Sequence, residues 1–401
     1  MKLIFDVSDK PKAGQLVVFA LQQMLAILAA TIAVPLIIGN GLTPAAAMFG
    51  AGVGTIVYIL FTKRKSPVFL GSSFAFLGSM AAAFAGGVSM QLGMLGLIVG
   101  AFLAGLVYVV IAIVVKFVGV GWLNKLMPAV VIGPTVAIIG LSLAGNAIGD
   151  LVKGDVTKQV TEYAVSTDSG TPEIIETVSN VPVGSSYVAL ICGLITLAVV
   201  MLCSTYGKKT LRLIPFIIGI LAGYAAAAIF TVIGNICDID ALKIVDFSVF
   251  SSYMLTDGSV SLKTFVSLPD FAFVSGLKGL KEFDFTYFAT IFVAYVPVAL
   301  VVFAEHVADH KNLSSIIDHD LLEEPGLTRT LLGDGVGSIA GALFGGCPNT
   351  TYGESVACVA ITGNASVITI FAAAVGCMLF SFITPLVAFV DSIPACVMGG
   401  V

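Results

Sequence analysis

The sequence predicts an all-α polytopic membrane protein, and three observations support this fold class. The 401 residues are 58% hydrophobic and only 11% charged, against about 25% charged residues in soluble domains, and the mean hydropathy is +1.06. Apolar runs close to the roughly 20 residues that a bilayer requires recur along the whole chain. Polar, helix-breaking residues interrupt two of these runs at a depth where the backbone has no water to bind.

Hydropathy predicts eleven membrane spans. They lie near 16–38, 44–62, 67–86, 91–116, 127–149, 187–204, 213–236, 285–306, 327–345, 348–362 and 366–390. The first run is longer than the roughly 7–15 apolar residues of a cleavable signal peptide, so we interpret it as a span. Two polar stretches, about 150–186 and 237–284, are expected to form loops outside the membrane.

Basic residues in the short loops predict the orientation. On one side these loops contain Lys63, Arg64, Lys65, Lys116, Lys125, Lys208, Lys209, Arg212, Lys311 and Arg329. The short loops on the other side, near 39–43 and 87–90, contain none. Because cytoplasmic loops are enriched in Lys and Arg, we expect a cytoplasmic N-terminus and two extracellular long loops. The basic residues are few and scattered, so no nucleic-acid partner is expected.

The third and tenth spans share an interrupted pattern. The segments 71–74 and 349–352 each hold two hydroxyl residues followed by an aromatic one, and a helix-compatible apolar run comes next. They lie seven spans apart, and because seven is odd the two units run in opposite directions. That pattern is typical of inverted-repeat transporters, whose binding sites lie at the interrupted segments.

The predicted organisation is therefore an inverted repeat of seven plus seven helices. Residues 1–236 form the first repeat, 237–284 an extracellular loop, and 285–401 the second repeat. Only four spans of the second repeat are complete before the chain stops, at the start of another apparent helix. We therefore expect about three C-terminal helices to be missing.

The interrupted segments are expected to form short mid-membrane β-strands. Residues 72–74 and 350–353 would meet near the midplane, and each would lead into a half-helix whose first N–H groups are free. Two such helix ends facing one cavity can donate hydrogen bonds to carbonyl oxygens or anions. The alternative is a kinked helix whose Ser and Thr hydroxyls bond to their own backbone.

Three carboxyls are candidate site residues. Glu354 directly follows Gly353, while Glu305 and Asp309 lie four residues apart and so share one stripe of a helix. An ionisable residue at membrane depth indicates a functional site, and a carboxyl there can take up and release a proton. The alternatives are that Glu354 only caps its half-helix and that Glu305 belongs to an interfacial cluster at a helix end. Asp334 is expected to lie in the N-terminal part of its span.

Metal sites are not expected. His306 and His310 lie on the stripe next to the carboxyls, but Val307 stands where a His-Glu-x-x-His protease needs its glutamate. The seven cysteines occur singly, without a C-x-x-C pair, which favours buried small hydrophobic residues over disulfides or a metal cluster.

Several motifs resemble the nucleobase transporter family, which also includes ascorbate transporters, and specifically its uracil permease branch. They are Leu21-Gln22-Gln23-Met24-Leu25-Ala26 with Val34-Pro35-Leu36, Leu70-Gly71-Ser72-Ser73-Phe74-Ala75-Phe76, Ala304-Glu305-His306, Asp320-Leu321-Leu322 with Pro325-Gly326-Leu327, Pro348-Asn349-Thr350-Thr351-Tyr352-Gly353-Glu354, and Ile393-Pro394 with Val397-Met398-Gly399-Gly400-Val401. They follow one another along the whole chain, and the Thr-Thr-Tyr-Gly-Glu run is highly specific.

The resemblance implies a fold divided into a core domain that carries the substrate and a gate domain. It also implies proton-coupled import of uracil across the bacterial cytoplasmic (inner) membrane by elevator-like movement, with no cofactor besides the coupling proton. Substrate contacts are expected from Ser73, Phe74, Glu305, Tyr352, Gly353 and Glu354, and proton coupling from Glu305, Asp309 and Glu354. The expected partners are uracil or a related nucleobase, the lipid bilayer and a second copy of the chain in a homodimer.

Two positions depart from the uracil permease pattern. Ser355 stands where Asn is frequent, and Asp309 stands where some members have His, with His310 one place later. The alternatives on the same fold are a purine or xanthine permease and a sulfate-type anion transporter. The tenth-span motif favours a pyrimidine over a purine, and two carboxyls would repel an anion.

Overall fold

Helices make up most of the protein, as predicted. The computed structural model describes residues 3–119, 147–166, 173–207, 215–254 and 262–401, with a few further positions between them. The α-helices are α1 (Ala13–Ile38), α2 (Pro44–Phe61), α3 (Leu77–Ala83), α4 (Met90–Val118), α7 (Ser186–Tyr206), α9 (Pro215–Cys237), α10 (Ser248–Met254), α11 (Ala272–Gly276), α12 (Phe285–Ile317), α13 (Leu327–Gly345), α14 (Gly353–Thr362), α15 (Val367–Phe380), α16 (Thr384–Asp391) and α17 (Ala395–Gly400). The strands are β1 (Leu70–Ser72), β2 (Thr157–Ser166), β3 (Glu173–Pro182) and β4 (Asn349–Thr351), and the short non-α helices are η1 (Phe74–Phe76), η2 (Asp240–Leu242), η3 (Leu262–Thr264), η4 (Leu277–Lys281) and η5 (Leu322–Gly326).

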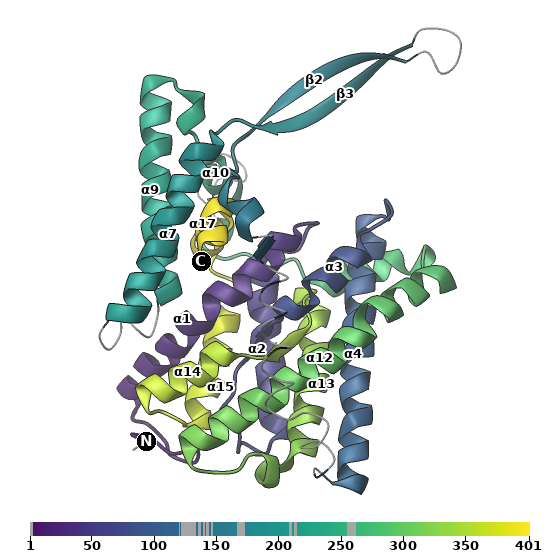
Figure 1. Cartoon of the computed structure of the whole chain (residues 1–401), viewed down its shortest axis with the longest axis vertical. Helices are drawn as coiled ribbons and strands as arrows, with labels where there is room; N and C mark the ends of the chain where they lie inside the picture. The colour runs from purple at the N-terminus through teal and green to yellow at the C-terminus, as the bar shows by residue number, and fades with distance from the viewer. Residues whose placement is uncertain are drawn as a thin grey trace.

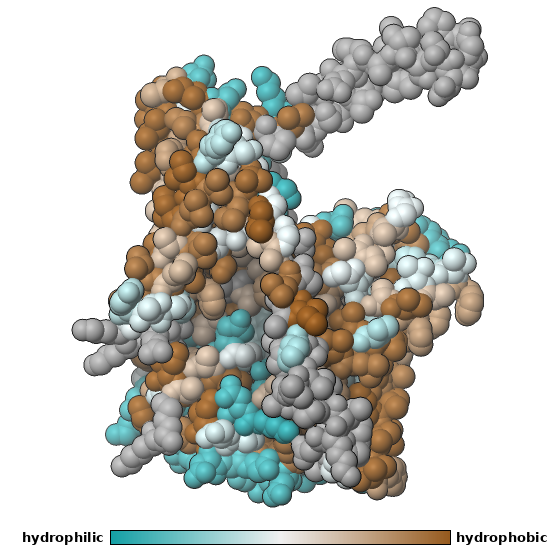
Figure 2. Space-filling model, in the orientation of Figure 1, coloured by the Kyte–Doolittle hydropathy of each residue, from teal (hydrophilic) through white to brown (hydrophobic). Residues whose placement is uncertain are grey.

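Several helices present apolar side chains outward, as a bilayer requires. Six of the described helices, α1, α2, α4, α7, α9 and α12, are long and apolar enough to cross a membrane. Figure 2 shows apolar residues over α7, α9 and the outer side of α4. On these helices Tyr187, Ile236 and Phe117 are at least 78% exposed. A soluble protein would not expose side chains of this kind in such numbers. The protein is therefore a multi-pass membrane protein.

The described helices form a large body and a smaller group beside it (Figure 1). In the body, α13 packs against α2 and α4, α12 packs against α4, and α15 packs against α1 and α2. In the smaller group α7 pairs with α9, and α17 packs against both. The antiparallel hairpin of β2 and β3 projects away from the helices.

Close approach of the backbones sets the position of α13 against α2. A Cβ atom on Gly50 of α2 would lie 2.4 Å from the carbonyl oxygen of Gly341 in α13, and one on Gly54 would lie 2.8 Å from that of Gly337. Interfaces of small residues are how membrane helices gain packing contacts without a hydrophobic driving force. The two helices between them hold the broken segments described below.

Most predicted spans match the observed helices to within a few residues, with two corrections. The helix α12 continues to Ile317, beyond the predicted span at 285–306. The prediction ended too early because polar side chains after residue 304 lower the hydropathy, although the chain stays helical. The span predicted at 366–390 is two helices, α15 and α16, separated at residues 381–383. The loop predicted at about 150–186 contains the β2–β3 hairpin. The span predicted near 127–149 lies largely outside the described residues.

The cysteines are mostly small buried residues, as expected. Cys192, Cys347, Cys358, Cys377 and Cys396 are buried, Cys203 is partly buried and Cys237 is exposed. The prediction was therefore wrong for Cys237, which lies at the end of α9.

The loop before β2 holds the start of α17. Asp155 Oδ1 accepts a hydrogen bond from the backbone N–H of Ala395 at 3.2 Å, and the carbonyl of Lys153 accepts one from Cys396 at 3.1 Å. Burial raises the pKa of Asp155 from 3.8 to about 6. The carboxyl therefore binds its proton more tightly in the folded protein than in the unfolded chain.

Replacing Asp155 by Asn should make stability less dependent on pH. The wild-type protein loses stability as pH rises from about 4 to about 6, because ionised Asp155 is disfavoured where it is buried. Asn keeps an acceptor oxygen for Ala395 and stays neutral. We expect D155N to raise the melting temperature in detergent at pH 8 but not at pH 4. Asp270→Asn, at an exposed loop carboxyl, is the control. An equal change at both pH values in D155N would contradict the prediction.

Candidate functional site

Two three-residue strands pair inside the helical body. β1 and β4 are antiparallel, with Leu70 opposite Thr351 and Ser72 opposite Asn349. The pairing continues beyond the strands, because Ser73 N–H donates to the carbonyl of Pro348 at 2.9 Å and Tyr352 N–H to that of Phe69 at 3.2 Å. All six strand residues are buried. The prediction of short strands in the third and tenth spans is confirmed, but they lie at 70–72 and 349–351, earlier than the predicted 72–74 and 350–353.

Side chains of α2 and α13 hold the strand pair in place. Thr55 in α2 accepts a hydrogen bond from Leu70 N–H at 2.9 Å and donates to the Leu70 carbonyl at 3.2 Å. The Asn349 amide donates to the carbonyl of Gly50 in α2 at 3.1 Å, and its backbone N–H donates to Ser338 Oγ in α13 at 3.0 Å. Buried backbone groups need partners of this kind. These contacts with α2 and α13 therefore fix the position of both strands along the two helices.

A second layer of hydrogen bonds lies next to the strands. The Tyr352 hydroxyl donates to the carbonyl of Ser72 at 2.6 Å. Ser355 Oγ accepts a hydrogen bond from Phe69 N–H at 3.1 Å and another from the Gln23 side chain of α1. Ser355, one of the two departures from the expected pattern, thus joins α14 to α1 and to Phe69, the residue before β1. Gln23 was missed as a site residue, although it lies in one of the motifs.

Each strand leads directly into a helix. η1 and α3 follow β1, and α14 begins at Gly353 after β4. The first N–H groups of a helix have no partner within it, and the helix dipole makes that end positive. Phe74 and Gly353 therefore mark two places where backbone donors are available.

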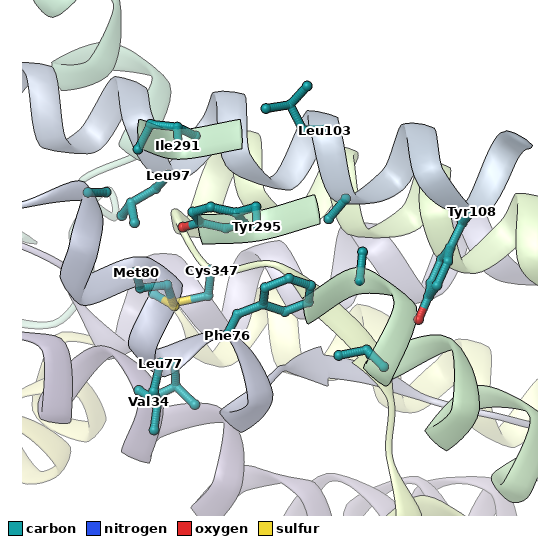
Figure 3. Close-up of a cluster of buried hydrophobic side chains, with 14 of the residues drawn as sticks. Val34, Phe76, Leu77, Met80, Leu97, Leu103, Tyr108, Ile291, Tyr295 and Cys347 are labelled. Atoms are coloured by element: carbon teal, nitrogen blue, oxygen red, sulfur yellow. The ribbon is translucent and has the colours of Figure 1, made fainter. Parts of the chain in front are cut away.

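Contacts with α12 fix the helix after β1. Ser79 donates to the carbonyl of Ala294 at 2.7 Å, and the Tyr287 hydroxyl donates to that of Ala83 at 2.7 Å. Phe76 and Tyr295 stack with ring centroids 5.6 Å apart. Figure 3 shows these two rings within a larger group of buried apolar side chains.

A cavity of about 300 Å³ lies at the two helix starts. Phe74 and Glu354 line it, together with Ala30, Ala33 and Phe216 among others. A second cavity of about 600 Å³ shares Leu77 and Asp150 with it and so adjoins it. The combination of a mostly apolar wall and two carboxyls, Asp150 and Glu354, is typical of small-molecule sites.

The other two predicted carboxyls approach this region from α12. Thr351 of β4 donates to Asp309 Oδ2 at 3.0 Å, and a Cβ atom on Gly353 would lie 3.9 Å from Asp309 Oδ1. Glu305 lies within electrostatic range of both Asp309 and Glu354. Glu305 is not among the described residues that line either cavity.

Ser73 and Tyr352 are placed differently from Phe74 and Glu354. Both are at most 5% exposed, and their hydrogen bonds join the two strand segments. Neither Ser73 nor Tyr352 is among the described residues that line the cavity. The structure thus groups Phe74, Gly353 and the three carboxyls, with Ser73 and Tyr352 in the layer that supports them.

The neighbouring stripe of α12 carries a buried polar network. His306 Nδ1 lies 2.6 Å from Asp334 Oδ2 in α13, and His310 Nε2 lies 2.6 Å from the Tyr58 hydroxyl in α2. The two imidazole rings stack at 4.0 Å. Asp334 is fully buried in the middle part of α13, so its predicted place in the N-terminal part of the span was wrong.

The imidazole nitrogens are all engaged within the protein. The remaining two contact Thr330 Oγ1 at 3.1 Å and the carbonyl of His306 at 2.8 Å. Across the described part of the chain no group of three metal-ligating side chains occurs. The network therefore acts in packing α12 against α2 and α13. Sequence reasoning missed it, since His306 and Asp334 lie 28 residues apart.

Comparison with known proteins identifies the family of this chain. Residues 14–401 match the xanthine/uracil permease model, which is described as "Permease family". The chain belongs to the xanthine/uracil permease family. It is 35% identical to the uracil permease of Bacillus caldolyticus, with 100% of this chain and 79% of the relative covered. It is 32% identical to the uracil permease of Escherichia coli (strain K12), with 98% and 77% covered.

Solved structures of other transporters share the architecture of this xanthine/uracil permease family member. The transmembrane domain of the cyanobacterium bicarbonate transporter BicA superposes with a TM-score of 0.65 at 14% identity, covering 98% of this chain and 88% of that chain. The structure of SLC26A9 gives a TM-score of 0.60 at 13% identity, covering 97% and 57%. At such low identity the likeness concerns the fold alone.

The contact between Gly71 and Tyr352 should be sensitive to a single methyl group. A Cβ atom on Gly71 would lie 2.4 Å from the Tyr352 ring, so Gly71→Ala must displace the ring and weaken its bond to Ser72. Overpacking of this kind typically costs about 1–3 kcal/mol. We expect a lower melting temperature in detergent. Gly78→Ala, where no atom of the described residues lies within 4 Å, is the control. An unchanged melting temperature for Gly71→Ala would count against this packing.

Removing the Asp334 carboxylate should destabilise the protein. Asp334→Ala leaves the buried His306 Nδ1 without its partner, and such a loss costs about 1–3 kcal/mol. Asp334→Asn keeps an acceptor oxygen and should cost less. Thermal unfolding checks this order, with Glu323→Ala in the exposed loop as the control. The network has no such role if Asp334→Ala and Glu323→Ala behave alike.

Proposed function

We propose that the protein is a proton-coupled symporter that imports uracil across the bacterial cytoplasmic membrane. The observation that carries the proposal is a cavity at two helix starts, where Phe74 and Glu354 line the wall and Asp309 lies close to Gly353. A uracil ring presents two N–H donors and two carbonyl acceptors. The site offers carboxylates for the former and free backbone N–H groups for the latter. The relatives' names as uracil permeases support the same substrate.

Each site residue has a proposed role. Glu354 and Glu305 accept hydrogen bonds from the ring N–H groups, and backbone N–H groups near Phe74 and Gly353 donate to the carbonyls. The Phe74 ring covers one face of the base. Glu305 stands back from the described cavity, so this role requires it to approach when the substrate binds. Ser73 and Tyr352 remain predicted contacts, and their buried hydrogen bonds support a positioning role.

Proton coupling is proposed for Glu305, Asp309 and Glu354. The three carboxyls interact electrostatically, so the protonation of one affects the others. Asp309 also accepts a hydrogen bond from Thr351, which links its charge to the strand that precedes Gly353. A proton on this group would travel with the substrate without any cofactor.

The wider architecture is proposed to be two inverted repeats, 1–236 and 285–401, divided into core and gate domains. The antiparallel pairing of β1 with β4, each followed by a helix, supports this arrangement. An elevator-like motion of the core would then carry the site across the membrane. We place the N-terminus in the cytoplasm on the distribution of Lys and Arg. The homodimer remains a prediction.

Two other substrates are less well supported. A purine or xanthine permease would share the family, but the named relatives at 30–35% identity are uracil permeases. An anion transporter would share the fold of BicA. Glu305 and Glu354 would repel an anion, however, and so favour a neutral base.

Uptake of radiolabelled uracil tests the proposal. Glu305→Gln and Glu354→Gln each replace a charged acceptor, and loss of such a hydrogen bond corresponds to at least about a tenfold effect. We expect either variant to abolish most uptake while the protein still reaches the membrane. Glu323→Gln, in an exposed loop, should leave uptake unchanged.

Two further arms of the same assay test the substrate and the coupling. Unlabelled uracil should compete with the label and xanthine should not, and collapse of the proton gradient should stop accumulation. Normal uptake by Glu305→Gln or Glu354→Gln would refute the proposed site. Stronger competition by xanthine would favour the purine alternative.

A further inference from the structure

An apolar groove on the outer surface of the helical body ends at two basic side chains. Its volume is about 370 Å³, and it runs between α2 and α15. Ile56 and Leu60 of α2 form one side, and Ile368 and Phe371 of α15 form the other. Leu60 and Phe371 are 62% and 45% exposed. These side chains lie on two helices of the membrane-spanning body, where the surrounding medium is lipid.

The segment before α1 closes one end of this groove. Ile4 N–H donates to the Gly363 carbonyl at 2.7 Å, and Val367 N–H donates to the Val7 carbonyl at 3.2 Å. Ser366 Oγ also donates to the Asp9 carbonyl at 2.6 Å. The N-terminal segment is thus attached to the turn between α14 and α15. This attachment places Lys10 at the mouth of the groove.

Three consecutive basic residues after α2 have three different environments. Lys65 pairs with Glu324, Lys63 is exposed, and Arg64 lines the groove. Lys63 and Arg64 have φ angles of 54° and 61°, and the Arg64 N–H donates to the Ile59 carbonyl at 3.0 Å. This left-handed turn folds the chain back toward α2 and so brings Arg64 to the groove.

The two cations at the groove have no acidic partner in the described part of the chain. The described ion pairs include neither Lys10 nor Arg64. The acids nearest in sequence are engaged elsewhere, since Asp9 Oδ2 accepts from Asp6 N–H at 2.8 Å and Asp6 Oδ1 accepts from Val7 N–H at 2.7 Å. An anionic lipid has an apolar acyl chain and a negatively charged head group. The apolar groove fits the acyl chain, and the two unpaired positive charges fit the head group.

We propose that this groove binds an anionic phospholipid. An acyl chain lies along Ile56, Leu60, Ile368 and Phe371, and the phosphate lies between Lys10 and Arg64. The lipid belongs to the cytoplasmic leaflet, an assignment that rests on the proposed cytoplasmic N-terminus. A zwitterionic lipid fills the apolar part equally well but carries no net charge for the two cations. The site is separate from the transport cavity and shares no lining residue with it.

Lipid binding by the full chain tests the proposal. Protein in detergent is titrated with phosphatidylglycerol, and with phosphatidylcholine of the same chains, and retained lipid is measured by native mass spectrometry. The variant K10A/R64N removes both cations, and Asn tolerates the left-handed backbone at position 64. K12A/K63N is the matched control, because it removes two charges from the same two segments, including one at the other left-handed position, outside the groove.

We expect wild-type protein to retain phosphatidylglycerol in preference to phosphatidylcholine, and K10A/R64N to lose about tenfold or more of that preference. K12A/K63N should keep it. The single variants K10A and R64N should show intermediate losses, so the test does not depend on the folding of the double variant. Ile368→Trp, which fills the groove and leaves both cations, should also reduce retention.

Several results would overturn the proposal. Equal losses in K10A/R64N and K12A/K63N would mean general attraction between charges. Unchanged retention in K10A/R64N, or equal retention of the two lipids by wild-type protein, would mean that the groove has no anionic site. Displacement of the lipid by soluble glycerol phosphate would mean that the head group alone is bound. None of these measurements depends on uracil transport.

Discussion

The pairing of β1 with β4 is the interaction on which the rest of the molecule depends. A break in a membrane helix leaves backbone groups without partners, and in hydrocarbon each of them costs several kcal/mol. Here two breaks satisfy one another, and the hydroxyls of Thr55 in α2 and Ser338 in α13 satisfy what remains. The close contact of α2 with α13 supplies those side chains at the required height. Two helix starts are thereby fixed around one cavity, an arrangement that neither segment could keep alone.

The helix α12 separates two kinds of polar chemistry on adjoining stripes. Glu305 and Asp309 approach the helix starts, while His306 and His310 are fully buried against α2 and α13. The imidazoles bind protein partners with all their nitrogens, so they anchor the helix. The carboxyls remain available to other groups. In the proposed proton-coupled mechanism, this rigid support would keep the binding groups in position when the charge of the carboxyls changes.

The sequence predicted the membrane class, most spans and the two strands, because long apolar runs and polar interruptions leave local signals. It failed where the determinant was not local. The end of α12 was placed too early, since polar residues that face protein lower hydropathy as much as those that face water. The break at 381–383 was missed within an apolar run, although Pro385 at the start of α16 was an available signal. The hydrogen bond between His306 and Asp334 depends on the packing of α12 against α13, which cannot be predicted from residue spacing in the sequence.

The carboxyl and imidazole stripes of α12 limit the mutations that this helix can accept. Each residue turns an α-helix by about 100°, so one inserted or deleted residue between Pro297 and Glu305 would turn both the carboxyls and the imidazoles away from their present neighbours. No local adjustment could restore both sides, because the rings stack and bind α2 and α13. The outward positions Val293 and Leu300, which are 69% and 51% exposed, have no such restriction. Substitutions on the lipid-facing side of this helix are therefore tolerated, but insertions and deletions before Glu305 are not.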